Sequence, residues 1–314
     1  MKAQSHDRQW LDRRRFVKAS LVPAALAIAD GRAGRPTQGA ESAPGEAAAG
    51  PEIIDTNVHL FRWPFRRLKY DRTEALVRKL RRHRIVQAWA GSFEAVWHKQ
   101  LDGANRRLAD ECRGRGDGLL VPIGSVNPVW PDWEEDLRRC HEQYRMPGIR
   151  LYPAYHGYGL DHPELLRLLG AAARRGLLVQ IAIRMEDERV HHPSVVAPVV
   201  NASPLPKVLA RVPEARVQLL NADTVFRSGH VGALIERTRT TFDIAAVEGN
   251  GGIARLIADT HPTYRGRVPV ERLLFGTHAP FFPCESALLK LFESPLDRPQ
   301  LNAIMFANAR RLLG

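Results

Sequence analysis

The stretch EIIDTNVHLFRWPF, residues 52–65, places three polar side chains at the end of an apolar run. Asp55, Asn57 and His59 are spaced two residues apart, so in an extended strand they point to the same side. An imidazole can serve as a general base near neutral pH, and its free nitrogen is a good metal ligand. We therefore predict Asp55 and His59 as catalytic residues, and His59 also as a metal ligand.

A second imidazole follows a similar apolar run near the C-terminus, in RLLFGTHAPFF, residues 272–282. We predict His278 as the third catalytic residue and as a second metal ligand. Other polar side chains follow the remaining apolar runs or lie in the loops beyond them. An arginine fork binds a carboxylate through two hydrogen bonds, which favours a carboxylate-bearing substrate. The predicted substrate-binding residues are Arg66, Tyr152, Arg184, His191, Asn221 and Glu248.

The elements that must position these residues repeat in a regular order. Short apolar or β-branched runs alternate with helical patterns, which is typical of a parallel α/β fold. The predicted strands cover residues 52–59, 85–91, 119–126, 148–152, 177–183, 216–221, 241–247 and 272–276. The predicted helices cover residues 72–83, 102–113, 133–144, 163–175, 205–211, 229–237, 251–259, 286–293 and 299–313.

Eight strand–helix units in one chain predict the α/β class and a single (β/α)₈ TIM barrel. A doubly wound open sheet also alternates in this way, but no glycine-rich phosphate motif follows the first strand. Barrel enzymes carry their chemistry at the carboxyl ends of the strands, where the predicted site residues fall. His59 and His278 could alternatively be packing or turn residues, and that alternative stays open at this point.

Three motifs resemble the amidohydrolase-related family of the amidohydrolase superfamily. IIDTNVHLF resembles its first-strand motif, LLFGTHAPFFP its eighth-strand motif, and FANARRLL its closing helix. The resemblance runs from about residue 52 to the C-terminus. It implies a barrel fold. The family includes small-molecule hydrolases, sugar lactonases and nonoxidative decarboxylases, and one of its lactonases works without a metal.

The ligand positions of that family are only partly filled here. The resemblance implies metal ligands at Asn57 and His59 on the first strand, Ala182 on the fifth, Asn221 on the sixth and His278 on the eighth. Alanine offers no donor atom, and amide oxygens are weak zinc ligands. We therefore expect no binuclear site. A single divalent metal such as Zn²⁺ is possible on His59 and His278, with a third ligand from Asp55, Glu248, His191 or His192.

The first 50 residues differ in composition from the rest. RRRFVKAS, residues 13–20, resembles a twin-arginine export signal, and a short apolar run ending in Ala27-Ile28-Ala29 follows it. That run is too short to span a membrane. We predict a signal peptide over residues 1–29, a disordered linker over residues 30–50, and a barrel domain over residues 51–314. The resemblance implies the twin-arginine export machinery as a partner. It also implies that the mature protein is periplasmic or extracellular.

These observations predict an exported hydrolase that cleaves an ester, lactone or amide bond in a small, anionic molecule. The formal charge of +12 suits such a substrate, and no nucleic-acid-binding motif is present. One alternative is a barrel without catalysis that binds a small molecule. Another is a nonoxidative decarboxylase of the same family. The hydrolase interpretation requires the two imidazoles to lie within about 8 Å of each other and to be reachable from the barrel mouth.

Overall fold

The computed structural model describes residues 51–313, which contain eight parallel strands. β1, β2 and β3 form one sheet, and β4 to β8 form a second sheet in sequence order. The strands are β1 (Ile53–Leu60), β2 (Ile85–Ser92), β3 (Leu120–Pro122), β4 (Gly148–Leu151), β5 (Leu178–Ala182), β6 (Arg216–Leu220), β7 (Thr241–Asp243) and β8 (Leu273–Leu274).

Two single bridges join these sheets into a closed ring. Val58 of β1 pairs in parallel with Ala279 just beyond β8, and Gly124 just beyond β3 pairs with Ile149 of β4. A closed ring of eight parallel strands leaves no free sheet edge. The chain therefore forms the single (β/α)₈ barrel that the sequence predicts.

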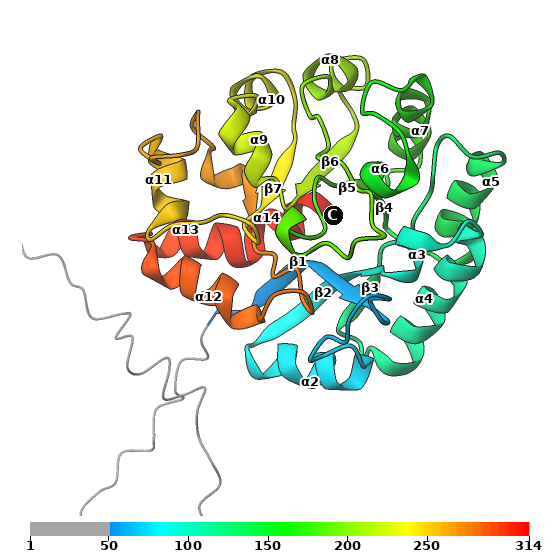
Figure 1. Ribbon diagram of the computed structural model, residues 1–314. Coiled ribbons are helices and arrows are strands. Elements are labelled where there is room, and N and C mark those ends of the chain that lie inside the picture. The colour runs from blue at the N-terminus through cyan, green and yellow to red at the C-terminus, as the bar shows by residue number, and fades with distance from the viewer. Residues whose placement is uncertain (1–50, 314) are drawn as a thin grey trace, which may run out of the picture. The chain divides into compact units, whose positions relative to one another are not determined.

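Helices surround this ring on its outside (Figure 1). They are α2 (Thr73–Arg82), α3 (Glu94–Trp97), α4 (Leu101–Arg115), α5 (Trp133–Arg138), α6 (Pro153–His156), α7 (Pro163–Arg174), α8 (Leu205–Leu209), α9 (Asp223–Ser228), α10 (Val231–Arg237), α11 (Gly252–Ala258), α12 (Cys284–Glu293), α13 (Arg298–Asn302) and α14 (Asn308–Leu313). Short π- or 3₁₀-helical turns are η1 (Arg139–Gln143), η2 (Glu188–Val190), η3 (Val270–Arg272) and η4 (Ala303–Ala307). The buried face of α2 carries Leu76, Val77 and Leu80, the spacing of an amphipathic helix against a sheet.

The amino-terminal end of the barrel is plugged by apolar side chains. Ile54, Trp89 and Leu178 form a buried cluster there with Leu274 and Ala309, the last of which comes from α14. Figure 1 shows α14 across the axis of the ring. Because this end is filled, the polar strand ends at the opposite rim are where a small molecule can be bound.

Polar side chains fill the middle of the barrel and connect strands on opposite sides of it. Gln180 of β5 donates to the carbonyl of Thr56 and to Gln218 Oε1, each at 2.8 Å. Gln218 Nε2 in turn donates to Thr56 Oγ1 at 2.7 Å. Arg150 of β4 donates through Nε to Gln180 Oε1 at 2.8 Å. All four side chains are buried, so their hydrogen bonds replace the water that they lose on folding.

The eight predicted strands all exist, although the later ones are shorter than predicted. β7 ends at Asp243 rather than at residue 247, so the expectation of a longer seventh strand is wrong. The short helices α3, α6 and α9 are additions to the predicted set. The predicted signal peptide and linker lie outside the described residues. Within residues 51–313, no helix is long and apolar enough to cross a membrane.

The packing of Arg150 requires a glycine on the neighbouring strand. A Cβ added at Gly91 would lie 2.7 Å from Arg150 Nη1, and that guanidinium cannot move away without breaking several buried hydrogen bonds. We expect Gly91→Ala to lower the free energy of unfolding by about 1–3 kcal/mol, the usual cost of overpacking. Urea denaturation at neutral pH measures this change.

The matched control is Gly114→Ala on the exposed side of α4, where an added Cβ meets nothing within 4 Å. That variant should gain up to about 1 kcal/mol from the higher helix propensity of alanine. Equal stabilities for both variants and the wild type would contradict the fixed position of Arg150.

Candidate functional site

Asp55 ties the first half of β1 to the segment just beyond β8. Its carboxylate accepts hydrogen bonds from Thr277 Oγ1 at 2.6 Å, from Thr277 N at 3.0 Å and from Asn57 N at 3.1 Å. Complete burial raises the pKa of Asp55 to about 7 in spite of these donors. The structure thus places this predicted catalytic residue beneath the rim, with both carboxylate oxygens already engaged.

A second buried carboxylate, Asp243 of β7, organises the two asparagines at ligand positions. Asp243 accepts from Asn57 Nδ2 at 2.6 Å and from the backbone N–H of Asn221 at 3.0 Å. Asn57 Nδ2 also donates to Asn221 Oδ1 at 3.1 Å. Burial raises the pKa of Asp243 to about 6. Asn57 Oδ1 has no hydrogen-bond partner within residues 51–313.

The structure brings His59 and His278 together. Their ring centroids lie 5.3 Å apart with nearly perpendicular planes, within the distance that one water or ion can bridge. His278 has a φ of +57°, a left-handed conformation that non-glycine residues rarely adopt and that often marks a functional position. Its Nε2 donates to the carbonyl of Met185 at 2.7 Å, which holds the ring in place.

Both imidazoles are closed off from solvent in this conformation. His59 is 1% exposed and His278 is fully buried. Phe93 stacks on His59 at 4.9 Å, and Phe281 stacks on His278 at 5.0 Å. The distance that the hydrolase interpretation requires is therefore present, whereas direct access from the mouth is not.

Arg150 places a fixed positive charge beside His59. Its Nη1 lies 3.0 Å from His59 Nε2 and also donates to the carbonyl of Val58 at 2.9 Å. Burial first, and then the charge of Arg150, lower the pKa of His59 well below its ordinary value. Burial likewise lowers the pKa of His278 to about 3, with a further contribution from Arg150. Both rings are therefore neutral at physiological pH.

The residues at the mouth do not fit a catalytic metal. A hydrolytic zinc site needs about three protein ligands, and here only His59 and His278 supply suitable nitrogens. Arg150 already lies against His59, and His278 Nε2 is already bonded to a carbonyl. Ala182 offers no donor atom, and Asn57 and Asn221 offer only amide oxygens, which are weak ligands for zinc. Within residues 51–313, no other carboxylate or imidazole lies close enough to this pair to serve as a third metal ligand.

Two of the predicted substrate-binding residues belong to the layer that covers the imidazoles. Arg66 forms an ion pair with Glu186, and its guanidinium lies 5.4 Å above the ring of Phe281. Tyr152 is buried, with its ring centroid 6.3 Å from that of His59 and its hydroxyl 3.4 Å from the carbonyl of Ser92. Burial raises the pKa of Tyr152 to about 12, so its hydroxyl stays protonated.

The other predicted substrate-binding residues spread from the site to the rim. Asn221 lies inside the site, where its Nδ2 donates to the carbonyl of Arg184 at 2.7 Å. The Arg184 guanidinium pairs with the buried Asp223 at 3.0 Å. Glu248 lies farther out, 63% exposed and paired with Arg227 at 2.8 Å, because β7 ends five residues before it.

His191 is half-buried in the long segment between β5 and α8. Within residues 51–313 its side chain forms no hydrogen bond or ion pair. Its neighbour His192 stacks on Phe65 at 4.8 Å. The structure thus attaches this segment to the loop after β1, without bringing His191 to the two imidazoles.

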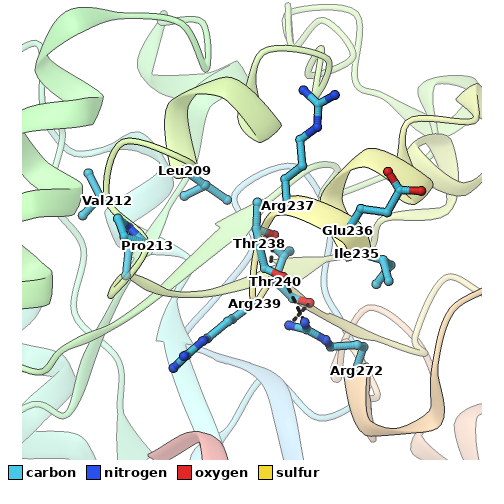
Figure 2. Close-up of a pocket in the computed structure, with 11 residues that line it drawn as sticks. Leu209, Val212, Pro213, Ile235, Glu236, Arg237, Thr238, Arg239, Thr240 and Arg272 are labelled. Carbon is cyan, nitrogen blue, oxygen red and sulfur yellow. Dashed lines mark hydrogen bonds between the residues drawn. The ribbon is translucent and has the colours of Figure 1, made fainter.

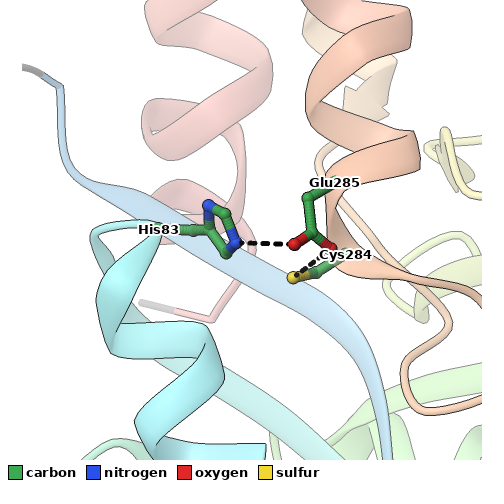
Figure 3. A group of neighbouring side chains, drawn as sticks. All are labelled: His83, Cys284 and Glu285. Carbon is green, nitrogen blue, oxygen red and sulfur yellow. Dashed lines mark hydrogen bonds and ion pairs between the residues drawn. The ribbon is translucent and has the colours of Figure 1, made fainter. Parts of the chain in front are cut away.

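Two features outside the mouth, a surface cavity and a cluster of potential metal ligands, lack the properties of a functional site. The cavity in Figure 2 lies between α8 and α10, with Leu209, Ile235 and Arg272 among its lining residues, and none of the predicted site residues lines it. His83, Cys284 and Glu285 bring three potential metal ligands within 4.8 Å of one another (Figure 3). There, however, Lys79 already neutralises Glu285, and burial raises the pKa of the Cys284 thiol to about 12.

Several residues that shape the mouth are absent from the predicted set. Arg150 and Asp243 point into the barrel from strands, and the signal for each is a charged residue inside an otherwise apolar run. Trp63 and Glu186 lie in loops and Tyr155 lies in the short helix α6, where residue type alone does not distinguish a site from a solvated surface.

Comparison with known proteins places the barrel in a family. The model of the amidohydrolase family matches residues 54–314, so the chain belongs to that family. No curated protein matches the chain. The fold is similar to several solved structures, each at low sequence identity.

A 2,6-dihydroxybenzoate decarboxylase in complex with 2,6-dihydroxybenzoate has a TM-score of 0.63 and 15% identity, over 84% of this chain and 99% of that chain. An uncharacterised TIM-barrel protein from Bordetella bronchiseptica has a TM-score of 0.63 and 13% identity, over 83% and 98% of the two chains. A manganese-bound 5-carboxyvanillate decarboxylase mutant from Novosphingobium aromaticivorans has a TM-score of 0.60 and 12% identity, over 84% and 97%. At these identities the likeness establishes the fold alone.

The raised pKa of Asp55 gives the stability of the barrel a defined pH dependence. Above pH 3.8 an unfolded Asp55 loses its proton, whereas the folded residue keeps it up to about pH 7. The folded state therefore binds more protons in this window, and Asp55 makes the protein less stable as the pH rises from about 4 to about 7. We expect Asp55→Asn to remove this contribution.

Urea unfolding at several pH values between about 4.5 and 7 tests this expectation. The stability of Asp55→Asn relative to wild type should rise with pH, by up to about 1.4 kcal/mol per pH unit. The difference between the two proteins isolates Asp55 from the histidines, whose lowered pKa values have the opposite effect over the same window. A constant difference across the pH range would show that Asp55 is ionised in the folded protein.

Proposed function

We propose that this member of the amidohydrolase family is a metal-independent hydrolase of a small carboxylate-bearing molecule. The bond cleaved is an ester, lactone or amide. The observation that carries the proposal is the neutral imidazole pair of His59 and His278 beside the fixed charge of Arg150, with no third metal ligand among residues 51–313. A neutral imidazole can take a proton from water, and a buried positive charge favours an anionic substrate.

His278 is the better candidate for the base. Because its Nε2–H donates to the carbonyl of Met185, the lone pair belongs to Nδ1. The low pKa of this ring makes it a weak base in the free protein. A substrate carboxylate bound nearby brings a negative charge that raises this pKa towards the value useful for proton transfer. Substrate binding and activation of the base are thus coupled.

Substrate reaches the imidazoles only when the aromatic cover moves. Phe281 lies on His278, and Arg66 lies above Phe281 while it pairs with Glu186. That ion pair joins the loop after β1 to the segment after β5. Figure 1 shows this second segment passing in front of the strands. An anionic substrate that competes for Arg66 would open this ion pair and give a route to the imidazoles. The pair can then re-form over the bound substrate and the reacting water.

Specific observations favour two other functions. Burial of both imidazoles favours a barrel that binds its ligand without catalysis. The decarboxylases among the similar structures favour a decarboxylation of an aromatic acid. One of these decarboxylases binds manganese, whereas the mouth of this barrel has no set of three metal ligands among residues 51–313. We therefore place hydrolysis first.

We also propose that the protein is exported by the twin-arginine pathway to the periplasm or beyond. The support is the RRRFVKAS sequence at residues 13–20. A folded passenger suits this route, and the barrel needs no partner chain to close its sheet.

The test is hydrolysis of a panel of carboxylate-bearing lactones and esters by protein dialysed against EDTA. We expect activity that EDTA does not remove and that falls by roughly a hundredfold or more in His278→Gln, the usual contribution of a general base. The matched control is His83→Gln, which changes a half-buried histidine outside the barrel and should keep wild-type activity.

Product analysis separates the candidate functions. Release of carbon dioxide instead of a hydrolysis product from the same acids would replace the proposal with decarboxylation. Loss of all activity after EDTA, with recovery on adding Zn²⁺ or Mn²⁺, would contradict a metal-independent site. Binding without turnover by any member of the panel would favour the binding protein.

A further inference from the structure

Three buried polar atoms in the layer above the imidazoles have no hydrogen-bond partner within residues 51–313. They are Trp63 Nε1, Tyr155 Oη and Glu186 Oε2. Trp63 is 2% exposed, and the Glu186 side chain is 1% exposed. A buried polar group that lacks a partner destabilises the folded state, so three of them in one place require an explanation.

Trp63 and Glu186 come from the segments after β1 and β5, and Tyr155 comes from α6, but the three lie in one cluster. The ring centroids of Trp63 and Tyr155 are 6.3 Å apart. Burial raises the pKa of Tyr155, and the neighbouring Glu186 carboxylate raises it further. Trp63 also packs on Phe281 at 5.0 Å, the ring beneath the Arg66–Glu186 ion pair. Trp63 packs on Phe281, the Arg66–Glu186 pair lies over Phe281, and Tyr155 packs on Trp63, so the three unpaired atoms belong to one cluster at the mouth.

This cluster reaches the surface through Trp97. The Trp97 side chain is 37% exposed, and its ring lies 5.3 Å from Trp63, 5.1 Å from Tyr155 and 5.1 Å from Phe65. Aromatic faces bind the apolar faces of rings. A ring-shaped ligand can therefore approach along Trp97 and place its polar substituents against the three unpaired atoms.

The chemistry of these atoms defines the complementary ligand. The indole N–H only donates, the Glu186 oxygen only accepts when ionised, and the Tyr155 hydroxyl can do both. Arg66 neutralises the other oxygen of Glu186, so a hydroxyl suits the free oxygen better than a second cation. The Arg66 guanidinium is itself 41% exposed and can bind a carboxylate.

We propose that Trp63, Tyr155 and Glu186 form a binding site for a ring compound that carries a carboxylate and at least two hydroxyl groups. The hydroxyls bind the three unpaired atoms, the ring packs on the aromatic cluster, and the carboxylate binds Arg66. This proposal rests on the proposed function for its substrate, but the binding step does not depend on hydrolysis. Two sources share this chemistry, a cyclic sugar acid and a hydroxybenzoate.

Isothermal titration of the full chain with four acids tests the site. D-Glucuronate and 2,6-dihydroxybenzoate carry the hydroxyls, whereas cyclohexanecarboxylate and benzoate are matched rings without them. We expect at least one hydroxylated acid to bind at millimolar concentration or below, and at least about tenfold more tightly than its matched ring, the effect of one or more buried hydrogen bonds. The tighter of the two hydroxylated acids identifies the source.

Tyr155→Phe removes one unpaired hydroxyl and leaves the aromatic ring in place. It should weaken the hydroxylated acid by roughly threefold to tenfold while the melting temperature stays equal or rises, because no hydrogen bond is lost in the free protein. The matched control is Tyr158→Phe, since the Tyr158 hydroxyl is also buried and unpaired but lies in the main core. Its stability should change in the same direction, and its affinity should not change.

Equal affinity of Tyr155→Phe and wild type for the hydroxylated acid would overturn the proposal. So would equal binding of hydroxylated and unsubstituted rings, or no binding of either hydroxylated acid. Binding with these properties but without hydrolysis would uphold this site and contradict only the proposed hydrolase activity.

Discussion

The buried guanidinium of Arg150 determines how the neighbouring strands and the two imidazoles are arranged. A charged group without water is unstable unless its donors are satisfied, and Arg150 finds acceptors on three strands: Gln180 Oε1, the carbonyl of Val58 and the carbonyl of Trp89. The space that it needs exists only because position 91 is a glycine. Strands β1, β2 and β5 are thereby fixed around one positive charge near the centre of the barrel.

This charge determines what the strand ends can do. In the direction of the mouth it meets His59, and together with burial it keeps both imidazoles neutral. A neutral imidazole next to a fixed cation is a proton acceptor and a poor partner for a second cation. The buried acids on the other side of the site are engaged by Thr277 and by the asparagines, so they do not offer free ligand oxygens.

The hydrogen bonding of the site changes above the imidazoles. Within residues 51–313, the inner polar groups are mostly hydrogen-bonded, whereas several of the outer ones are not. Below Phe281, most side-chain polar atoms have protein partners. Around and above it, Trp63, Tyr155 and Glu186 each keep one polar atom that has no partner in the described part of the chain. This difference separates the two roles that we assign. The inner residues hold or move a proton, and the outer residues select and orient the molecule on which they act.

The barrel itself could be predicted from the sequence, because eight apolar runs at regular spacing require a closed parallel sheet and the site must then lie at the strand ends. The proximity of His59 and His278 follows from the same argument. The sequence could not reveal that Arg150 points into the barrel and lies against His59, because a charged residue in a strand can face either way. The predicted length of β7 was also too great, because the apolar residues 244–247 form a loop instead of a strand. Glu248 therefore lies at the surface.

The most direct test of this account is the state of the two imidazoles in solution, with and without a metal. Nitrogen-15 NMR of the histidine rings, assigned with the His59→Gln and His278→Gln variants, reports both protonation and metal binding. The account predicts that both rings are neutral at about pH 5, below the ordinary histidine pKa, and that stoichiometric Zn²⁺ leaves their signals unchanged. Protonation of either ring near pH 6.5, or a zinc-induced shift of both, would contradict it.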